Sequence, residues 1–198
     1  KTYTEEELTK LPGNLKKNGG KSKYFCVRED GSEAWLTDVD GDRIVEFVER
    51  HKAKPFFLTV WTHEPHLPIE SDPKFMARYN HLNDPGIRQH HGHITQLDHA
   101  FGLLMKELDT QSLTGQTFVM FTSDNGPEGT GKGDRKNVAS MRNRTRGSTG
   151  GLRGRKRDTY EGGIRVPGIV RWPGRIKPAS VSDVPVYGCD IFPTICAI

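Results

Sequence analysis

The sequence predicts an α/β fold: a mainly parallel sheet with helices on both faces. Short apolar runs alternate along the chain with segments whose apolar residues recur every three or four positions, which is typical of strands alternating with helices. The apolar runs are continuous, as in strands buried on both faces. A chain of 198 residues can form one domain with a core, or part of a larger one.

The first part of the chain supplies one helix and one strand. Residues 1–34 are polar and are expected to form a loop-rich lead-in, before a domain that covers 35–198. DGDRIVEFVERH, at 40–51, has helical apolar spacing, and KPFFLTVWT, at 54–62, reads as a buried parallel strand. HEPHLPIESDP, at 63–73, is a loop punctuated by prolines.

The second part repeats this order. Residues 86–109 form the clearest predicted helix, with apolar side chains at three- and four-residue steps. TFVMFTS, at 117–123, is the second core strand, and GIVRW, at 168–172, is a last short strand. A final helix is expected to begin near Asp190.

Polar side chains follow both core strands where each one ends. His63 and His66 follow the first strand, and Asp124 and Asn125 follow the second. In parallel sheets the ligand site lies outside the carboxyl ends of the strands, so both clusters are expected at the same edge.

Asp124 and Asn125 offer a carboxylate and an amide oxygen, which suit Ca²⁺, or with less reason Mg²⁺. The alternative is a plain Asx turn, because Asp-Asn-Gly is common in turns. Two ligands cannot hold Ca²⁺ alone, since it takes about six to eight oxygens.

His63 and His66 lie three residues apart on the proline-rich loop. One of them could act as a general acid or contact an anionic substrate. The alternative is a pair of surface histidines, and most of the other histidines, His93 among them, are expected on exposed or helical surfaces.

A basic loop covers residues 126–158, with ten Lys and Arg between Lys132 and Arg157 and one acid, Asp134. It could be a solvated loop or a cationic wall around an anionic substrate. Nucleic acid is not expected as a partner, because no aromatic residue between 132 and 157 could stack on a base. The net charge of +4 favours anions only modestly.

Several stretches, taken together and in order, resemble the sulfatase family, within the alkaline phosphatase superfamily. They are PFFLTVWTHEPHLP, ITQLDHAFGLLMKEL, TFVMFTSDNGPEG, GLRGRKRDTYEGGIRVPGIVRWPGRI and CDIFPTI. The resemblance covers about residues 35–198, and the combination of SDNG with K-x-x-x-x-EGGIRVP is the most specific part.

The resemblance implies a role for each candidate residue. Asp124 and Asn125 would supply two Ca²⁺ ligands, so that the turn and the metal site are the same object. Lys156, five residues before Glu161, would contact a sulfate oxygen. His66 would bind sulfate or protonate the leaving alcohol, with His63 as the second candidate. The substrate would be a sulfated small molecule or glycan, and the location extracytoplasmic (periplasmic, secreted or lysosomal).

In the sulfatase family the nucleophile is a formylglycine, made from the Cys or Ser of a C/S-x-P-x-R motif. No such motif occurs in this chain, and Cys26, Cys189 and Cys196 do not fit it. The formylglycine is therefore expected in a longer parent protein, outside this chain. The chain therefore reads as the middle-to-late part of a sulfatase catalytic domain, inactive in isolation. The alternatives are a phosphodiesterase or phosphonate hydrolase of the same superfamily, and a non-catalytic module that binds sulfated glycans. No membrane span is expected, because no apolar run is long enough, and no oligomeric state follows from the sequence.

Overall fold

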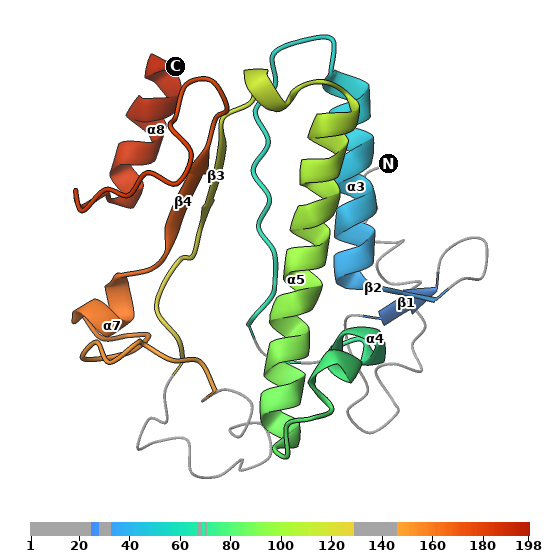
Figure 1. The fold of residues 1–198 in the computed structure, drawn as a ribbon, viewed down its shortest axis with the longest axis vertical. Coiled ribbons are helices and arrows are strands. Elements are labelled where there is room, and N and C mark those ends of the chain that lie inside the picture. Colours follow the sequence, from blue (N-terminus) through green and yellow to red (C-terminus); the bar gives the residue numbers. More distant parts are fainter. Residues whose placement is uncertain (1–24, 28–32, 67–68, 70, 129–145) are drawn as a thin grey trace.

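The computed structural model describes residues 25–27, 33–66, 69, 71–128 and 146–198. Figure 1 shows two parts, which we call the helical half (36–54, 63–66, 69 and 71–112) and the strand half (117–128 and 146–198). An extended segment at 55–62 runs between them (Figure 1).

A hairpin precedes the helical half, where the sequence suggested only loop. Strand β1, Phe25–Val27, pairs with β2, Glu33–Trp35, in antiparallel register, with Phe25 opposite Trp35. The chain passes from β2 directly into helix α3, Leu36–His51. The predicted helix at 40–51 is thus confirmed, and it begins four residues earlier than expected. The Asp38 carboxylate accepts a hydrogen bond from the Trp35 N–H at 3.0 Å, which satisfies one of the open donors at the helix start.

The longest helix, α5, runs over Pro85–Thr110 and confirms the prediction at 86–109. Asp84 caps it, because its carboxylate accepts hydrogen bonds from Gly86 N–H at 2.7 Å and Ile87 N–H at 3.2 Å. The short helix α4, Pro73–Met76, and the 3₁₀ turn η1, Ala77–Tyr79, lead into it. A second 3₁₀ turn, η2 at Thr114–Gln116, follows it.

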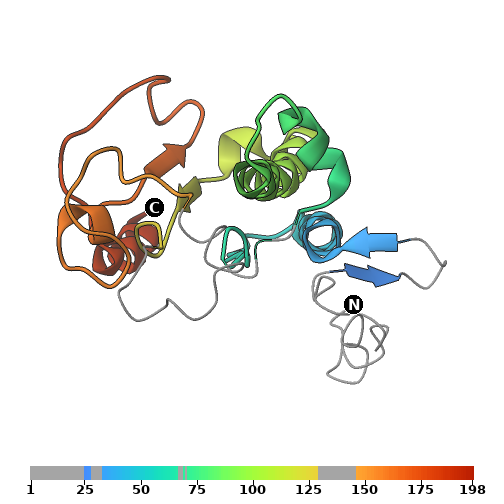
Figure 2. The ribbon, with the colours of Figure 1, turned by 90° about the horizontal axis from the view of Figure 1, so that it is seen from below.

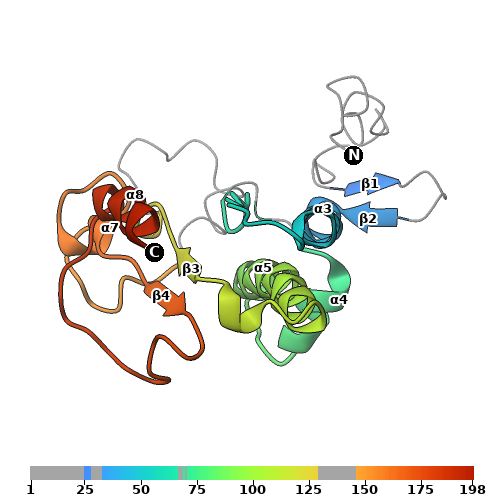
Figure 3. The same ribbon diagram turned by 90° about the horizontal axis from the view of Figure 1, so that it is seen from above.

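Helices α3 and α5 lie side by side and form the core of the helical half (Figures 2 and 3). Val48 on α3 and Leu108 on α5 are 0% and 1% exposed. Gly41 lets the two helices approach closely, because a Cβ there would lie 2.7 Å from the Leu103 Cδ1. The helical periodicity therefore predicted a real packing face.

The predicted buried strand at 54–62 is wrong. The segment is extended, but no described strand pairs with it. Phe57 is 67% exposed and Trp61 is 90% exposed. A strand exists only where a neighbour accepts and donates its ladder hydrogen bonds, and the described part of the chain offers 54–62 no such neighbour.

The strand half is built on a two-stranded sheet. Strand β3, Val119–Thr122, pairs with β4, Gly168–Arg171, with Val119 opposite Arg171. Both predicted strands are present, but the pairing is antiparallel and no parallel pair occurs among the described residues. The mainly parallel sheet expected from the sequence is therefore not shown: among the described residues β3 pairs with β4 alone, and the 54–62 segment stays unpaired.

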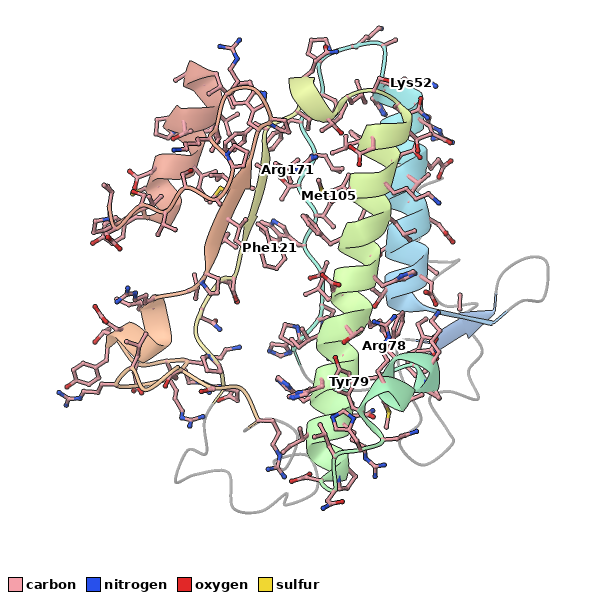
Figure 4. All side chains as sticks on the ribbon, in the orientation of Figure 1. Lys52, Arg78, Tyr79, Met105, Phe121 and Arg171 are labelled. Atoms are coloured by element: carbon pink, nitrogen blue, oxygen red, sulfur yellow. The ribbon has the colours of Figure 1, made fainter. Side chains whose placement is uncertain are left out.

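Two helices complete the strand half: α7, Glu161–Ile164, and α8, Gly188–Ala197, which confirms the helix expected near Asp190. Side chains join the halves between β3 and α5. The rings of Phe101 and Phe121 lie 5.6 Å apart, and Figure 4 shows Phe121 and Met105 pointing into the space between these elements. Within the described residues, no helix is both long and apolar enough to cross a membrane.

Candidate active site

The histidine loop, residues 63–66, forms a tight turn at the end of the extended segment. The His66 N–H donates to the His63 carbonyl at 2.8 Å, and the two imidazole rings stand edge to face with centroids 5.3 Å apart. His63 is half-buried and His66 is exposed. The turn therefore presents both candidate histidines as one unit.

Glu64 lies between these histidines in the sequence, but its side chain turns inward and is 3% exposed. The carboxylate accepts a short hydrogen bond from the Thr37 hydroxyl of α3 and a 3.2 Å hydrogen bond from the Gln96 amide of α5. Buried carboxylates are costly unless hydrogen-bonded, and these two donors meet that requirement. Glu64 thus anchors the histidine loop to both helices.

His93 on α5 lies beneath the same loop and is 1% exposed, against the expectation of a surface position. The pKa of His93 is lowered to about 4, mainly because burial disfavours the charged imidazolium. The nearby His63 and His90 lower this pKa further, whereas the Glu64 carboxylate raises it. Its Nε2 is 3.9 Å from the Glu64 carboxylate, which is too long for a hydrogen bond. His93 is therefore a neutral imidazole at pH 7, not an ion-pair partner.

Asp124 and Asn125 follow β3 in a turn that Ser123 shapes. The Ser123 hydroxyl donates to the Asn125 carbonyl at 3.1 Å, and the Asn125 side-chain amide donates to the Gly126 carbonyl at 2.9 Å. The Asp124 carboxylate is exposed and Asn125 is half-buried, and neither of these two hydrogen bonds uses the Asn125 side-chain oxygen or the Asp124 carboxylate. The residues form a turn, and the turn displays two oxygen donors.

Backbone contacts tie this turn to the segment that carries Lys156. The Gly126 N–H donates to the Gly163 carbonyl at 2.8 Å, and the Lys156 N–H donates to the Pro127 carbonyl at 3.0 Å. A Cβ at Gly126 would lie 1.9 Å from the Gly162 carbonyl oxygen, so only glycine permits this approach. The backbones of the two segments are therefore in direct contact at these glycines.

The arginines around Lys156 are engaged by neighbours. Arg153 stacks on Tyr160, with the guanidinium carbon 3.6 Å from the ring centroid, and Arg157 pairs with Glu128. Arg165 pairs with Glu161 at 3.2 Å. Among the described residues no acidic group pairs with the Lys156 ammonium. Lys132, Arg135, Lys136, Arg142 and Arg144 of the basic loop lie outside the described residues.

The donor set fits part of a calcium site. A carboxylate and an amide oxygen are hard ligands of the kind Ca²⁺ takes, although two of them fill only part of its coordination sphere. In the described ranges no group of three or more His, Cys, Asp or Glu could hold a metal. Asp124 and Asn125 can therefore contribute to such a site and cannot complete it.

The two clusters lie toward the same end of the molecule. In Figure 1 the extended segment and β3 both run from the C-terminal end of α5 toward its N-terminal end, so the histidine loop and the Asp124 turn follow segments with a common direction. Their supports differ: buried side chains hold the histidine loop, and backbone contacts hold the turn.

The sequence reasoning missed the residues beneath the histidine loop: Thr37, Glu64, His93 and Gln96. One signal was available. Glu64 is a charged residue between two candidate histidines, directly after an apolar run, where an inward-facing carboxylate needs donors from elsewhere. Nothing in the sequence pattern identified Thr37 or Gln96 as those donors, because they lie 27 and 32 residues away.

Comparison with known proteins shows what this arrangement is similar to. The sequence model of the family described as Sulfatase matches residues 8–198. An N-acetylgalactosamine-6-O-sulfatase of Bacteroides thetaiotaomicron is 34% identical over 182 residues, which are 91% of this chain and 32% of that protein. Arylsulfatase A of Bos taurus is 34% identical over 170 residues, covering 83% of this chain and 30% of that protein.

Solved structures agree in fold. Ps i-CgsB, in complex with k-i-k-neocarrahexaose, superposes with a TM-score of 0.74 at 23% identity, over 99% of this chain and 41% of that one. The PsFucS1 sulfatase from Pseudoalteromonas sp. gives a TM-score of 0.55 at 24% identity, over 77% of this chain and 30% of that one. The chain spans about a third of the length of the two curated relatives.

Proposed function

The chain belongs to the sulfatase family, and we propose that it contributes part of the active site of a sulfuric ester hydrolase. The observation that carries the proposal is the backbone tie between the Asp124 turn and the Lys156 segment. It brings two hard oxygen donors, which can hold a cation, and a lysine into one local unit, and a sulfate ester needs positive charge around its oxygens. The family match favours this reaction over phosphodiester cleavage and over glycan binding without catalysis.

Lys156 is the candidate contact for a sulfate oxygen. Its ammonium has no acidic partner in the described part of the chain, whereas neighbouring Arg157 and Arg165 are paired with Glu128 and Glu161. A cation without an internal partner can stabilise the negative charge of the sulfate oxygens in the transition state. We therefore assign the substrate-binding role to Lys156 and not to the arginines beside it.

His66 and His63 are the candidates for protonating the leaving alcohol or for binding sulfate. His66 is exposed and His63 half-buried, and their rings are in contact. A general acid must reach the leaving oxygen directly, which favours the more exposed His66. His63 remains the second candidate.

Calcium is the proposed metal. When bound, it would supply positive charge to the sulfate oxygens. Asp124 and Asn125 would hold it from one side with a carboxylate and an amide oxygen. The formylglycine nucleophile of the family would come from a part of the protein outside this chain, since no C/S-x-P-x-R motif occurs in it.

The proposed substrate is a sulfated carbohydrate or another sulfated alcohol. One relative is an N-acetylgalactosamine-6-O-sulfatase, and one structural neighbour was solved with a neocarrahexaose. The Lys and Arg residues of the basic loop at 126–158 would favour an anionic saccharide. An extracytoplasmic location, the division at residue 35 and the inactivity of the isolated chain stay predictions.

The test is a kinetic comparison in the sulfatase that carries this chain. Lys156→Met should lower kcat/KM for an aryl sulfate by about 10²-fold, because it removes one charge-stabilising donor. Lys177→Met, which changes an exposed lysine in a loop after β4, is the matched control and should leave the kinetics unchanged. Unchanged kinetics in Lys156→Met would contradict the assignment.

A second measurement addresses the metal. Asp124→Ala should weaken Ca²⁺ binding, measured by calorimetry, and should lower activity in parallel. Asp183→Ala, which removes an exposed carboxylate in the loop before α8, serves as its control.

A third measurement concerns the nucleophile. Robust turnover of an aryl sulfate by the purified 198-residue chain would refute the view that the nucleophile lies elsewhere.

A further inference from the structure

One buried amide holds the chain at two points: at Glu64, between the candidate histidines, and at Asp72, after them. Gln96 of α5 is 0% exposed. Its side-chain nitrogen donates to the Thr37 hydroxyl at 2.8 Å and to the Glu64 carboxylate at 3.2 Å. Its side-chain oxygen accepts a hydrogen bond from the Asp72 N–H at 2.9 Å.

The orientation of this amide is fixed by its partners. A backbone N–H can only donate, so the atom facing Asp72 must be the oxygen, and a carboxylate can only accept, so the atom facing Glu64 must be the nitrogen. Thr37 closes the network, because its hydroxyl accepts from Gln96 and donates to Glu64. Each member thus has a single way to satisfy its neighbours.

We propose that Gln96 and Glu64 are positioning residues, which set the place of His63 and His66 by clamping residues 64 and 72 to helix α5. The proposal deepens the proposed function, since it concerns the same site. Glu64 faces inward, whereas His63 is half-buried and His66 is exposed. One backbone hydrogen bond joins the two histidines. A shift of Glu64 therefore moves both imidazoles together.

The clamp acts through geometry, because neither side chain reaches the surface. Gln96 and Glu64 are 0% and 7% exposed, so no substrate can touch them. A displacement of about 1 Å at a reacting group can cost about 10²-fold in rate. Losing the clamp should accordingly lower kcat, while KM, which reflects contacts from many groups, changes much less.

The first experiment observes the histidines without using activity. Ring signals of His63 and His66 are recorded by NMR in the full 198-residue chain for the original sequence, Gln96→Met and Gln111→Met. Gln96→Met keeps the side-chain length but removes the amide. Gln111→Met makes the same change at the C-terminal cap of α5, away from the loop. The ring signals should shift or broaden in Gln96→Met alone, and unchanged signals there would overturn the proposal.

The second experiment measures kcat and KM of the same variants in the sulfatase that carries the chain. Gln96→Met should lower kcat by about 10²-fold, with KM nearly unchanged. If the ring signals change while kcat does not, the positioning role is refuted. If the original protein lacks sulfatase activity while the ring signals still respond, the proposed function fails and the clamp stands.

A second pair of variants covers the case in which Gln96→Met does not fold. Thr37→Val removes the hydroxyl that bridges Gln96 and Glu64, and Thr37→Ser restores it at nearly the same place. The histidine signals and kcat should change in Thr37→Val and return in Thr37→Ser. Equal behaviour of the two variants would mean that packing, not the hydrogen-bonded clamp, is what matters.

Discussion

The helical half and the strand half carry their candidate residues in opposite ways. In the helical half, the histidine loop rests on a buried polar network above an apolar core that includes Val48 and Leu108. In the strand half, the Asp124 turn is held by backbone hydrogen bonds at glycines. There, Ile169 is 59% exposed, Phe192 76% and Val181 90%.

The difference follows from how helices and strands satisfy their backbone hydrogen bonds. A helix closes its backbone hydrogen bonds internally, so two helices can bury their apolar stripes against each other without help. A strand needs a neighbour on each edge and cover on each face, and β3 has one neighbour, β4, among the described strands. Large apolar side chains of the strand half are therefore left exposed in the described part of the chain.

The largest effect on stability is expected when truncating a buried residue of the helical half is compared with truncating an exposed residue of the strand half. Leu108→Ala should lower the free energy of unfolding by about 2–5 kcal/mol, because it leaves a cavity between α3 and α5. Ile169→Ala, on the exposed face of β4, should change it by less than about 0.5 kcal/mol. Urea unfolding of the 198-residue chain measures both. Equal losses would mean that Ile169 is covered, and the contrast between the halves would disappear.

The next effect concerns pH and the helical half alone. The pKa of His93 falls from 6.5 to about 4 on folding, mainly because burial disfavours the imidazolium. Below about pH 6.5 the unfolded chain takes up a proton at this residue, whereas the folded chain does so only near pH 4. Stability from this group is therefore complete above pH 6.5 and decreases by about 3 kcal/mol as the pH falls to 4.

His93→Gln should flatten the loss of stability in this window, because glutamine does not titrate. The measurement is urea unfolding at several pH values between 7 and 4, and the slope against pH is what counts, not the absolute stability. The burial-depressed pKa of His90 contributes in the same direction and stays in both proteins. His99→Gln, at an exposed position of α5, is the control. A slope in His93→Gln as steep as in the original protein would contradict the buried neutral state.

A smaller effect tests the glycine contacts of the strand half. Gly126→Ala should cost about 1–3 kcal/mol, because the new Cβ would overlap the Gly162 carbonyl. Gly168→Ala in β4 meets nothing within 4 Å and serves as the control. Hydrogen exchange of the Lys156 N–H, which bonds to Pro127, should speed up in Gly126→Ala only. Unchanged exchange would show that the turn and the Lys156 segment are held together by other means.

The smallest effect on stability compares Gly→Ala substitutions at two backbone conformations, one in each half. Gly102 is exposed within α5 with open space around it, so Gly102→Ala should stabilise the chain by about 0.5–1 kcal/mol. Gly174 follows β4 and has a φ of +82°, so Gly174→Ala should destabilise it. Thermal unfolding of both variants is the check. A stabilising Gly174→Ala would mean that this turn relaxes easily.

Much of the candidate site was visible in the sequence because its signals are local. Asp124-Asn125-Gly126 marks a turn after a strand, and the paired glycines before Arg165 mark a close backbone approach. The helix at 86–109 was equally clear, since its apolar periodicity is read from neighbouring residues.

The tertiary structure decided what depends on distant partners. The run at 54–62 has the composition of a buried strand, yet it is unpaired, because a strand is defined by neighbours that the run itself cannot supply. The antiparallel direction of the β3–β4 pair likewise depends on contact between segments far apart in the sequence.

The sequence by itself therefore determined helices α3, α5 and α8, the Asp124 turn and the types of chemical group that follow each apolar run. Only the tertiary structure decided that Glu64 turns inward, that Thr37 and Gln96 receive it, and that His93 is buried and neutral. The physical reason is that adjacent residues set the local backbone preference, whereas a buried polar group needs hydrogen-bond donors that come from separate elements of the fold.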